Sequence, residues 1–382
     1  MDPSGDAPVD LKLAARVAFR EGRFTDALAL FERLAAAAPD LWSAPYNTGL
    51  LLSHLGRPAE AEVALRRAIA LAPERGELRN DLALALLAQG REDEGWEAYL
   101  WRRQAPRAPE DRPREPLPAD LAGAGILLLN EQGLGDSLFF LRYAAELSRR
   151  GARLFHEPFA KLAGILSGVP WLEPVPRPAP DWRVPLGDLP YLTGLCHPPA
   201  LRLSPAPARQ AAVALRLARA GPPPYLGVTW HAGVRAPGNL IKDASPAALG
   251  AALAGWPGTL VLLQRVQEPG TVAAFAAAAG RAPADFSDLH EALDDMLCLL
   301  DRLDAHAAVS NTNVHLRAGL GRPQHVLVPW PAEFRWPAAP DRSPWFPDCR
   351  LYRQRPDGDW GPALADLAAD LGSRSALSPS GA

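Results

Sequence analysis

The sequence predicts an array of short α-helical hairpins followed by an α/β region of two lobes, each built on a parallel sheet. A 34-residue period within residues 11–104 predicts the hairpins. Strand and helix patterns that alternate from residue 124 onward predict the sheets. Residues 105–120 separate the two regions and are rich in proline, which continues neither helices nor central strands. We therefore expect a linker there.

Glycine and proline mark the repeat period. Gly22, Gly56 and Gly90 lie 34 residues apart, and Pro39 and Pro73 have the same spacing. Glycine supplies a left-handed turn between two helices, and proline closes the second helix. Apolar residues at helical spacing between these positions give each hairpin a buried stripe. The sequence thus predicts three hairpins.

These hairpins resemble the tetratricopeptide-repeat family over residues 11–104. Arrays of this kind usually present a concave surface to a peptide or protein, and a rigid spacer or dimerisation element is the alternative. The third unit departs from the pattern, because Trp96, Tyr99 and Trp101 replace lighter residues and no proline closes the unit at position 107. We expect this unit to pack on the domain that follows.

The α/β region divides into two series of elements. In the first lobe, residues 121–208, a strand at 126–130 leads through a glycine-rich turn into a helix at 136–149. The second lobe, with its hinge, occupies residues 209–372 and begins with a helix and the segment GPPP. Its expected strands are YLGVTW, GTLVLLQ, AHAAVS and QHVLVPW, with helices between them. Two doubly wound lobes leave a crevice between them, where ligands bind.

Composition narrows the functional classes. The chain of 382 residues has a net charge of −3, which gives no electrostatic reason to expect a nucleic-acid partner. Cys196, Cys298 and Cys349 are odd in number and far apart, so we expect no disulfide framework and a reducing cytoplasm. Residues 1–11 lack the pattern of a signal peptide, and no apolar run of about 18 residues predicts a membrane span.

Three motifs carry a second resemblance. GLGD at 133–136, GVTWHAG at 227–233 and SNTNVHLRAGLGRP at 310–323 resemble the motif set of heptosyltransferase-like glycosyltransferases. With the closing segment 334–360, the whole chain is similar to bacterial proteins that fuse tetratricopeptide repeats to such a domain. The resemblance implies the GT-B fold, which has two Rossmann-like lobes. It also implies a nucleoside diphosphate sugar bound mainly by the C-terminal lobe, and no metal ion or other cofactor.

The GLGD motif contributes the candidate base. Gly133 and Gly135 allow a tight strand-to-helix turn close to a ligand. Asp136 then begins a helix that faces the crevice, and the resemblance implies that it deprotonates the acceptor hydroxyl. The alternative is that Asp136 caps the helix, which is a common use of Asp at that position.

The segment SNTNVH contributes the candidate diphosphate site. It lies between a strand and a helix whose free N–H groups favour an anion. Ser310, Thr312 and Asn313 would bind the diphosphate, and His315 would add a proton or positive charge to it. Asn311 stands where the resembled family usually has Asp, which keeps the hydrogen bonding but removes a charge. The alternative is a polar helix cap with His315 satisfied locally.

The segment 229–245 follows the first strand of the C-terminal lobe. His231, Arg235 and Lys242 are cations suited to a diphosphate, and Trp230 belongs to the same candidate donor-binding set. Gln264, at the end of the next strand, is a candidate for hydrogen bonding to the base or ribose. The alternatives are a surface loop with solvated charges and a solvated strand end.

Other residues predict packing rather than chemistry. Trp336, Trp345 and Phe346 either wall the crevice or pack between lobes, and we favour packing. The remaining histidines show no metal-ligand spacing, so we expect structural roles for His156, His197, His290, His306 and His325. No hydrolase, P-loop, zinc-protease or dinucleotide motif occurs in a suitable context.

The sequence therefore favours a glycosyltransferase that transfers a sugar from a nucleoside diphosphate donor to a protein or glycan acceptor selected by the repeats. The rival is a non-catalytic adaptor with a degenerate transferase domain, which Asn311 favours, whereas Asp136 and His315 favour the enzyme. A third possibility is a transferase fold that binds nucleotide as a regulatory signal. Resemblance of fold alone does not decide between them.

Overall fold

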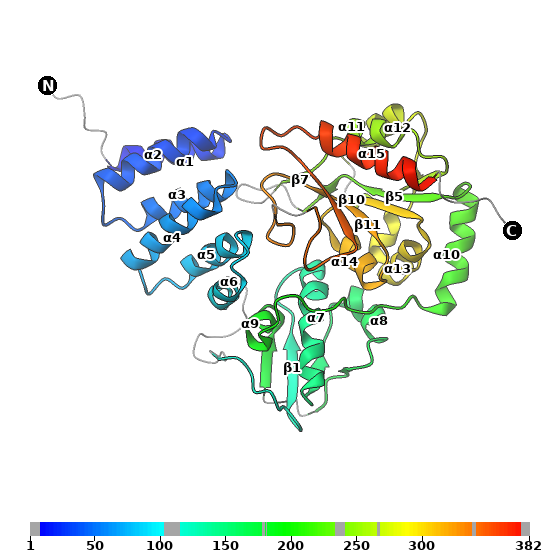
Figure 1. Ribbon diagram of the computed structural model, residues 1–382, viewed down its shortest axis with the longest axis horizontal. Helices are drawn as coiled ribbons and strands as arrows, with labels where there is room; N and C mark the ends of the chain where they lie inside the picture. The colour runs from blue at the N-terminus through cyan, green and yellow to red at the C-terminus, as the bar shows by residue number, and fades with distance from the viewer. Residues whose placement is uncertain are drawn as a thin grey trace.

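The computed structural model contains a helical array and two α/β lobes, which is the predicted architecture (Figure 1). It describes residues 8–102, 115–177, 180, 182–233, 241–265, 268–337 and 341–375. Most of the expected linker, residues 105–114, and the candidate ligand Arg235 lie outside this part of the chain.

Three helix hairpins form the N-terminal array, as the 34-residue period predicts. Their helices are α1 (Pro8–Arg20), α2 (Phe24–Ala37), α3 (Ser43–His54), α4 (Pro58–Leu71), α5 (Glu77–Ala88) and α6 (Glu92–Tyr99). The turn glycines Gly22, Gly56 and Gly90 have φ angles of 76°, 69° and 75°. These left-handed values confirm why glycine recurs at this position.

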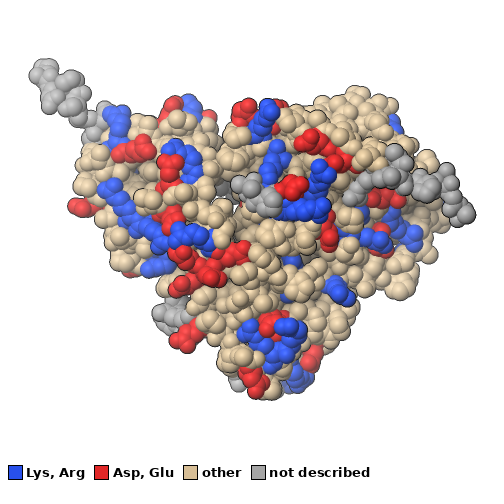
Figure 2. Space-filling model, in the orientation of Figure 1, with Lys and Arg blue, Asp and Glu red and all other residues tan. Residues whose placement is uncertain are grey.

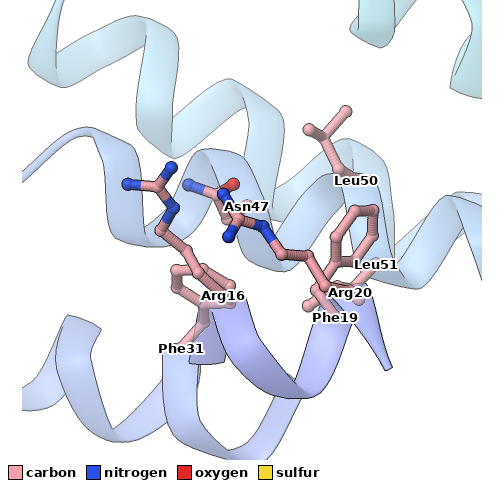
Figure 3. A pocket seen from close by; sticks show the side chains of 7 residues that line it. All are labelled: Arg16, Phe19, Arg20, Phe31, Asn47, Leu50 and Leu51. Carbon is pink, nitrogen blue, oxygen red and sulfur yellow. The ribbon is translucent and has the colours of Figure 1, made fainter. Parts of the chain in front are cut away.

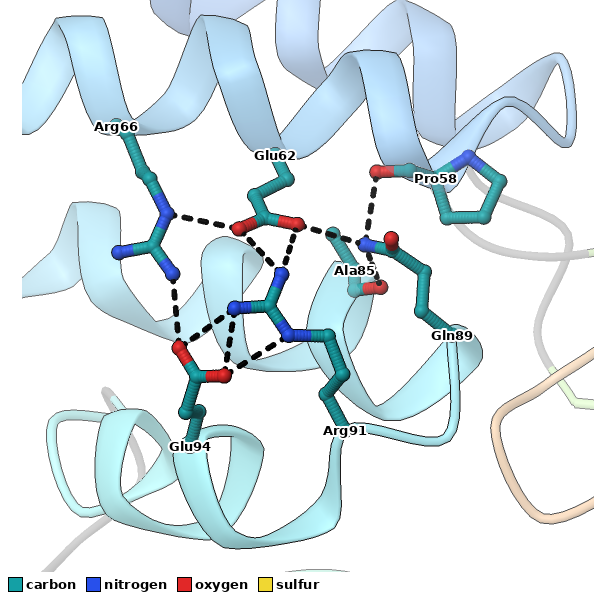
Figure 4. Close-up of polar contacts among 7 residues, drawn as sticks. All are labelled: Pro58, Glu62, Arg66, Ala85, Gln89, Arg91 and Glu94. Carbon is teal, nitrogen blue, oxygen red and sulfur yellow. Dashed lines mark hydrogen bonds and ion pairs between the residues drawn. The ribbon is translucent and has the colours of Figure 1, made fainter.

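An ion-pair network joins the second and third hairpins (Figure 4). Glu62 on α4 accepts hydrogen bonds from Arg66, Gln89 and Arg91, and Glu94 on α6 binds Arg91 in turn. The guanidinium of Arg91 thus bridges two carboxylates, with its side chain 39% exposed. Exposed pairs of this kind contribute little to stability.

The turn at Gly56 contacts the C-terminal lobe. A Cβ atom there would lie 2.2 Å from the ring of Trp330, whereas a Cβ at Gly90 would meet nothing within 4 Å. We expect Gly90→Ala to lower the free energy of unfolding by about 1 kcal/mol, from the left-handed backbone alone. Gly56→Ala is expected to lose roughly 1–3 kcal/mol more through overpacking against Trp330. If urea titrations gave the same loss of unfolding free energy for Gly56→Ala and Gly90→Ala, the contact between Gly56 and Trp330 would not form in solution.

The N-terminal lobe is a four-stranded parallel sheet with strand order β3-β2-β1-β4. Its strands are β1 (Gly125–Leu129), β2 (Arg153–His156), β3 (Leu172–Glu173) and β4 (Trp182–Pro185), and its helices are α7 (Leu134–Arg149), α8 (Ala163–Leu166) and α9 (Leu189–Thr193). The central strand β1 is an apolar run, GILLL, as expected for a strand with neighbours on both sides.

The C-terminal lobe is a six-stranded parallel sheet with strand order β12-β11-β10-β5-β8-β9. The strands are β5 (Tyr225–Thr229), β8 (Thr259–Leu262), β9 (Ala284–Asp285), β10 (Ala305–Val309), β11 (Gln324–Val328) and β12 (Cys349–Arg353). A short antiparallel pair, β6 (His231–Ala232) and β7 (Lys242–Asp243), lies beyond β5.

Helices of the C-terminal lobe cover both faces of the sheet. They are α10 (Pro207–Ala220), α11 (Pro246–Leu253), α12 (Thr271–Ala279), α13 (Leu293–Arg302), α14 (Thr312–Gly319) and α15 (Gly361–Ser375). One core packs α11, α12 and α15 on one face, and a second core packs α10, α13 and α14 on the other. No helix among the described residues is both long and apolar enough to cross a membrane.

The second core is continuous through all three parts of the chain. It contains Trp96 and Tyr99 of α6, the face of α7, and residues of α13 and α14. The Trp96 ring packs edge-on against Phe140 of α7 at 6.2 Å and Phe334 of the C-terminal lobe at 5.5 Å. The third hairpin therefore docks on the α/β region, as predicted from its aromatic residues. Trp101 instead stays within the array, beneath Arg79.

Candidate functional site

Two helix N-termini from different lobes meet at the lobe junction. Helix α7 follows β1 and Gly133, and α14 follows β10 and Asn311. A Cβ at Gly135 would lie 3.1 Å from Cδ2 of His315 and 3.8 Å from Cα of Thr312. The carboxyl ends of the central strands thus face each other, and the positive ends of two helix dipoles converge. Such a junction favours negative charge.

Asp136 lies in the first turn of α7 and forms an ion pair across the junction. Its Oδ1 accepts a hydrogen bond of 2.5 Å from Nη2 of Arg335. The cap of α7 is Gly133, and no side chain caps this helix, so the capping role considered for Asp136 does not occur. The Asp136 side chain keeps 32% exposure, whereas that of Arg335 keeps 9%.

Arg335 is a member of the site that sequence reasoning missed. Its guanidinium lies 4.6 Å from the ring centres of both Phe139 and Phe334. Burial opposes the charge, but Asp136 and Glu333 outweigh it and raise the pKa of Arg335. The only sequence signal is a lone arginine between two aromatic residues in the segment FRW. That pattern gives no hint of a partner 199 residues away.

A second ion pair lies beside the first. Lys242 of β7 binds Oε1 of Glu333 at 2.5 Å, and Trp336 donates to Oε2 at 3.2 Å. Burial alone would raise the pKa of Glu333, but Lys242, Arg335 and the Ser310 hydroxyl outweigh it and lower the pKa to about 2. Lys242 and Ser310 therefore do come together, and the group that joins them is a carboxylate that the sequence analysis did not select.

This depressed pKa predicts a pH dependence of stability. The carboxyl of Glu333 has its usual pKa of 4.5 when unfolded and about 2 when folded, so its contribution is complete above pH 4.5 and is lost as the pH falls toward 2. The shift corresponds to about 3 kcal/mol. Glu333→Gln is expected to flatten the fall in unfolding free energy between pH 4.5 and 2. Glu291→Gln, which removes an exposed partner of Lys161, is the control and should follow wild type.

His315 lies in the first turns of α14, buried against Phe139 and Phe346. Burial, reinforced by Arg335 and Arg142, lowers the pKa of His315 well below 6.5. The imidazole is therefore neutral at pH 7, so the predicted positive charge is not present on this side chain. Its Nδ1 has no partner among the described residues and borders a cavity of about 10 Å³, roughly the size of one water.

The N-terminus of α14 is capped locally. Oδ1 of Asn311 accepts hydrogen bonds from the backbone N–H of Asn313 at 2.8 Å and Val314 at 3.2 Å. An amide thus performs the cap without a charge. The side chain of Asn313 is 1% exposed, and neither of its amide atoms has a partner among the described residues. Buried polar groups normally have one, so the amide of Asn313 is an unsatisfied group beside the junction, although it is closed to solvent in this conformation.

Three other candidate residues, Gln264, Trp230 and His231, form contacts within the C-terminal lobe. Oε1 of the buried Gln264 accepts from the N–H groups of Trp230 and His231, and its Nε2 donates to the carbonyl of His231. Gln264 thus pins the turn after β5, and the predicted contact to a base or ribose has no support here. Trp230 stacks on Phe275 at 5.1 Å, and Nδ1 of His231 pairs with Asp243.

The remaining aromatic residues and histidines pack as expected. Trp336, Trp345 and Phe346 are buried, and Trp336 stacks on Phe346 at 5.1 Å. The five histidines all have structural hydrogen-bond partners: Leu128 for His156, Glu92 for His197, Leu263 for His290, Gln324 for His306 and Tyr352 for His325.

The repeat array holds a larger cavity of about 620 Å³ between α1, α2 and α3. Its lining residues are Arg16, Phe19, Arg20, Phe31, Asn47, Leu50 and Leu51. Figure 3 shows the side-chain nitrogens of Arg16, Arg20 and Asn47 gathered on one side of this groove. Neither arginine pairs with an acidic residue in the part of the chain that is described. On the face of the molecule that Figure 2 draws, basic and acidic side chains are interspersed.

Comparison with known proteins confirms the repeats. The profile of the family described as tetratricopeptide repeat matches residues 12–75 and 46–109. Over 395 aligned positions, the chain is 27% identical to Protein FlbA of Caulobacter vibrioides. The match covers 92% of this chain but 64% of FlbA, which is less than two thirds of that protein's length. The N-terminal part of the chain is thus a tetratricopeptide-repeat array.

Solved structures resemble the α/β region at low identity. A glycosyl transferase family 9 protein from Veillonella parvula matches with 10% identity and a TM-score of 0.48, over 68% of this chain and 98% of that one. The ADP-heptose LPS heptosyltransferase II of E. coli matches with 15% identity and a TM-score of 0.42, over 66% and 99% of the respective chains.

Proposed function

We propose that the chain is a glycosyltransferase that moves a sugar from a nucleoside diphosphate sugar to a protein or glycan acceptor. The observation that carries the proposal is the junction itself. A carboxylate at the start of α7 lies near the N-terminus of α14, whose buried Asn313 amide has no partner among the described residues. Base and anion site thereby lie on opposite lobes, which suits transfer between an acceptor and a diphosphate donor.

The donor's diphosphate is proposed to bind at the N-terminus of α14. The positive end of the α14 dipole favours the anion, the Asn313 amide and the Ser310 hydroxyl supply hydrogen bonds, and Lys242 supplies positive charge. The diphosphate would compete with Glu333 for Lys242 and Ser310, because all three already share one network. The proposal includes no metal ion or other cofactor.

Asp136 is proposed to be the base. Arg335 holds Oδ1, and Oδ2 has no hydrogen bond from the described residues. As the acceptor oxygen attacks the anomeric carbon, its proton passes to Oδ2, and the bond from that carbon to the diphosphate breaks. The negative charge then rests on the diphosphate, where the helix dipole and Lys242 stabilise it. Because His315 is neutral, its proposed part is a hydrogen bond rather than a resident charge.

The repeats are proposed to select the acceptor. The groove of Figure 3 combines an apolar floor of Phe19, Phe31 and Leu51 with Arg16 and Arg20, which form no ion pair with the described residues. These groups favour a segment that carries apolar and acidic side chains.

All three cysteines are free thiols, as the predicted reducing cytoplasm would leave them.

The second candidate function is that of a non-catalytic adaptor. Two observations favour it: the cations of the junction are already paired with Glu333 and Asp136, and Asn311 is committed to capping α14. In that case the repeats bind the partner and the α/β lobes only support them.

Ligand-induced stabilisation separates the two functions. A nucleotide that binds only the folded state raises the unfolding temperature by mass action. We expect a nucleoside diphosphate or its sugar conjugate to stabilise wild type, and to stabilise Lys242→Met less. Lys161→Met, which breaks a different ion pair between the lobes, with Glu291, is the matched control and should respond like wild type. If no nucleotide shifts the transition at millimolar concentration, the transferase proposal fails and the adaptor stands.

A further inference from the structure

Arg102, which follows α6, is buried between two carboxylates of the N-terminal lobe. Its Nη2 lies 2.5 Å from Oε1 of Glu131, and its Nη1 lies 2.5 Å from Oδ1 of Asp188. All three side chains are at most 1% exposed. Burial would lower the pKa of Arg102, but Asp188 and Glu131 outweigh it, so the guanidinium stays charged. Removing one member of such a buried network leaves an uncompensated charge, so the three side chains depend on one another.

Glu131 belongs to the loop 130–133, which leads from β1 into α7, and Asp136 lies in the first turn of that helix. Its Oε1 also accepts from the backbone N–H of Gly187 at 2.8 Å. The next residue, Gln132, accepts a hydrogen bond of 3.1 Å from the Tyr99 hydroxyl of α6. The loop is therefore held from the repeat side by two side chains of the third hairpin, and from the sheet side by Gly187.

We propose that Arg102 is a positioning residue: through Glu131 it fixes the loop 130–133 and thereby the start of α7, where Asp136 lies. The third hairpin is then a structural part of the site, in addition to any part of the array that binds an acceptor. The catalytic half of this inference rests on the proposed function. The structural half, that Arg102 orders the loop, stands without it.

The geometry requires arginine rather than any cation. Arg102 uses Nε and Nη2 on Glu131 while Nη1 reaches Asp188 and the carbonyl of Tyr99 at 3.1 Å. A lysine ammonium is a single point that cannot span both carboxylates in this planar fork. Arg102→Lys therefore keeps the positive charge but loses the contact with one of the two carboxylates, which loosens the loop.

Hydrogen exchange and kinetics on Arg102→Lys test the inference. The matched control is Arg91→Lys, because Arg91 also bridges two carboxylates, Glu62 and Glu94, but is exposed and remote from the loop (Figure 4). In Arg102→Lys we expect the peptide spanning residues 126–141 to exchange at least about 10-fold faster. We also expect kcat to fall by about 10- to 100-fold with the donor KM nearly unchanged, because the base is misplaced but the donor site is intact. Arg91→Lys should change neither.

The outcomes separate this inference from the proposed function. Unchanged exchange in a folded Arg102→Lys, or equal acceleration in both variants, overturns the positioning role. If wild type transfers no sugar, the proposed function fails, and the exchange measurement still decides whether Arg102 orders the loop. If Arg102→Lys does not fold, Glu131→Gln, which keeps the side-chain size, is measured in its place. In the Asp136→Asn background, Arg102→Lys should cause no further loss of kcat, and an additional loss would show a role independent of Asp136.

Discussion

Asp136→Asn is expected to lower kcat for sugar transfer by about 10²–10⁴-fold, the usual contribution of a positioned general base. The amide keeps the shape of the side chain but cannot take the acceptor proton through Oδ2. Donor binding should persist, because the groups assigned to the diphosphate lie on the other lobe. The measurement is initial-rate kinetics with the nucleotide sugar that stabilises wild type.

The controls for this prediction use the same helix. Glu146→Gln removes a half-buried carboxylate near the opposite end of α7 that pairs with Arg149 and Arg150, and it should leave kcat unchanged. Asp136→Asn also leaves the buried Arg335 without its partner, which destabilises the fold, so rates are compared well below the unfolding transition. A loss of less than about threefold would contradict the role of Asp136 as base.

Trp96→Ala is expected to cause the largest loss of stability, about 3–5 kcal/mol in the free energy of unfolding. The side chain is 3% exposed and packs against rings from α6, α7 and the C-terminal lobe. Removing it opens a cavity where the array and both lobes meet. Urea titration followed by circular dichroism measures the loss.

Trp42→Ala is the matched control for Trp96→Ala. Trp42 is half-buried in the array, where it contacts Tyr46 and lies beneath Arg75, with no ring contact to either lobe. Trp42→Ala should lower the free energy of unfolding by less than Trp96→Ala does, and it should leave the contacts between the array and the lobes intact. Equal losses for the two variants would show that Trp96 stabilises only its own hairpin.

The parts of the fold that follow from local chemistry were predictable. Gly22, Gly56 and Gly90 reveal the hairpins because a left-handed turn admits few other residues. The apolar runs reveal the inner strands because both of their faces are buried. Strand β12 went unpredicted because it lies at the edge of the sheet, and its sequence CRLYR, with two arginines, is no apolar run. The final helix α15 also went unpredicted.

The candidate site was predictable only in part, because its members are joined through space. Asp136, Lys242, Ser310 and Asn313 stand out from their places after strands or at helix starts. Their partners do not: Glu333 and Arg335 lie in an irregular segment after β11, and nothing local shows that they pair with Lys242 and Asp136. Gln264 is the opposite case: the sequence suggested a ligand contact, and in the structure its side chain hydrogen-bonds to the backbone of Trp230 and His231. A polar residue at the end of a strand is compatible with both roles.

The continuous core that runs from α6 through α7 to α14 limits how this protein can be re-engineered or can diverge. Exchanging the whole array would expose the aromatic faces of both lobes and remove Arg102. The exchangeable unit is the first two hairpins, which contribute every residue that lines the 620 Å³ groove. The turn at Gly56 must be kept in any such exchange, because it fits Trp330. Substitutions that alter the groove can thus accumulate during evolution without disturbing the lobes. Substitutions in the third hairpin require compensating substitutions in the lobes.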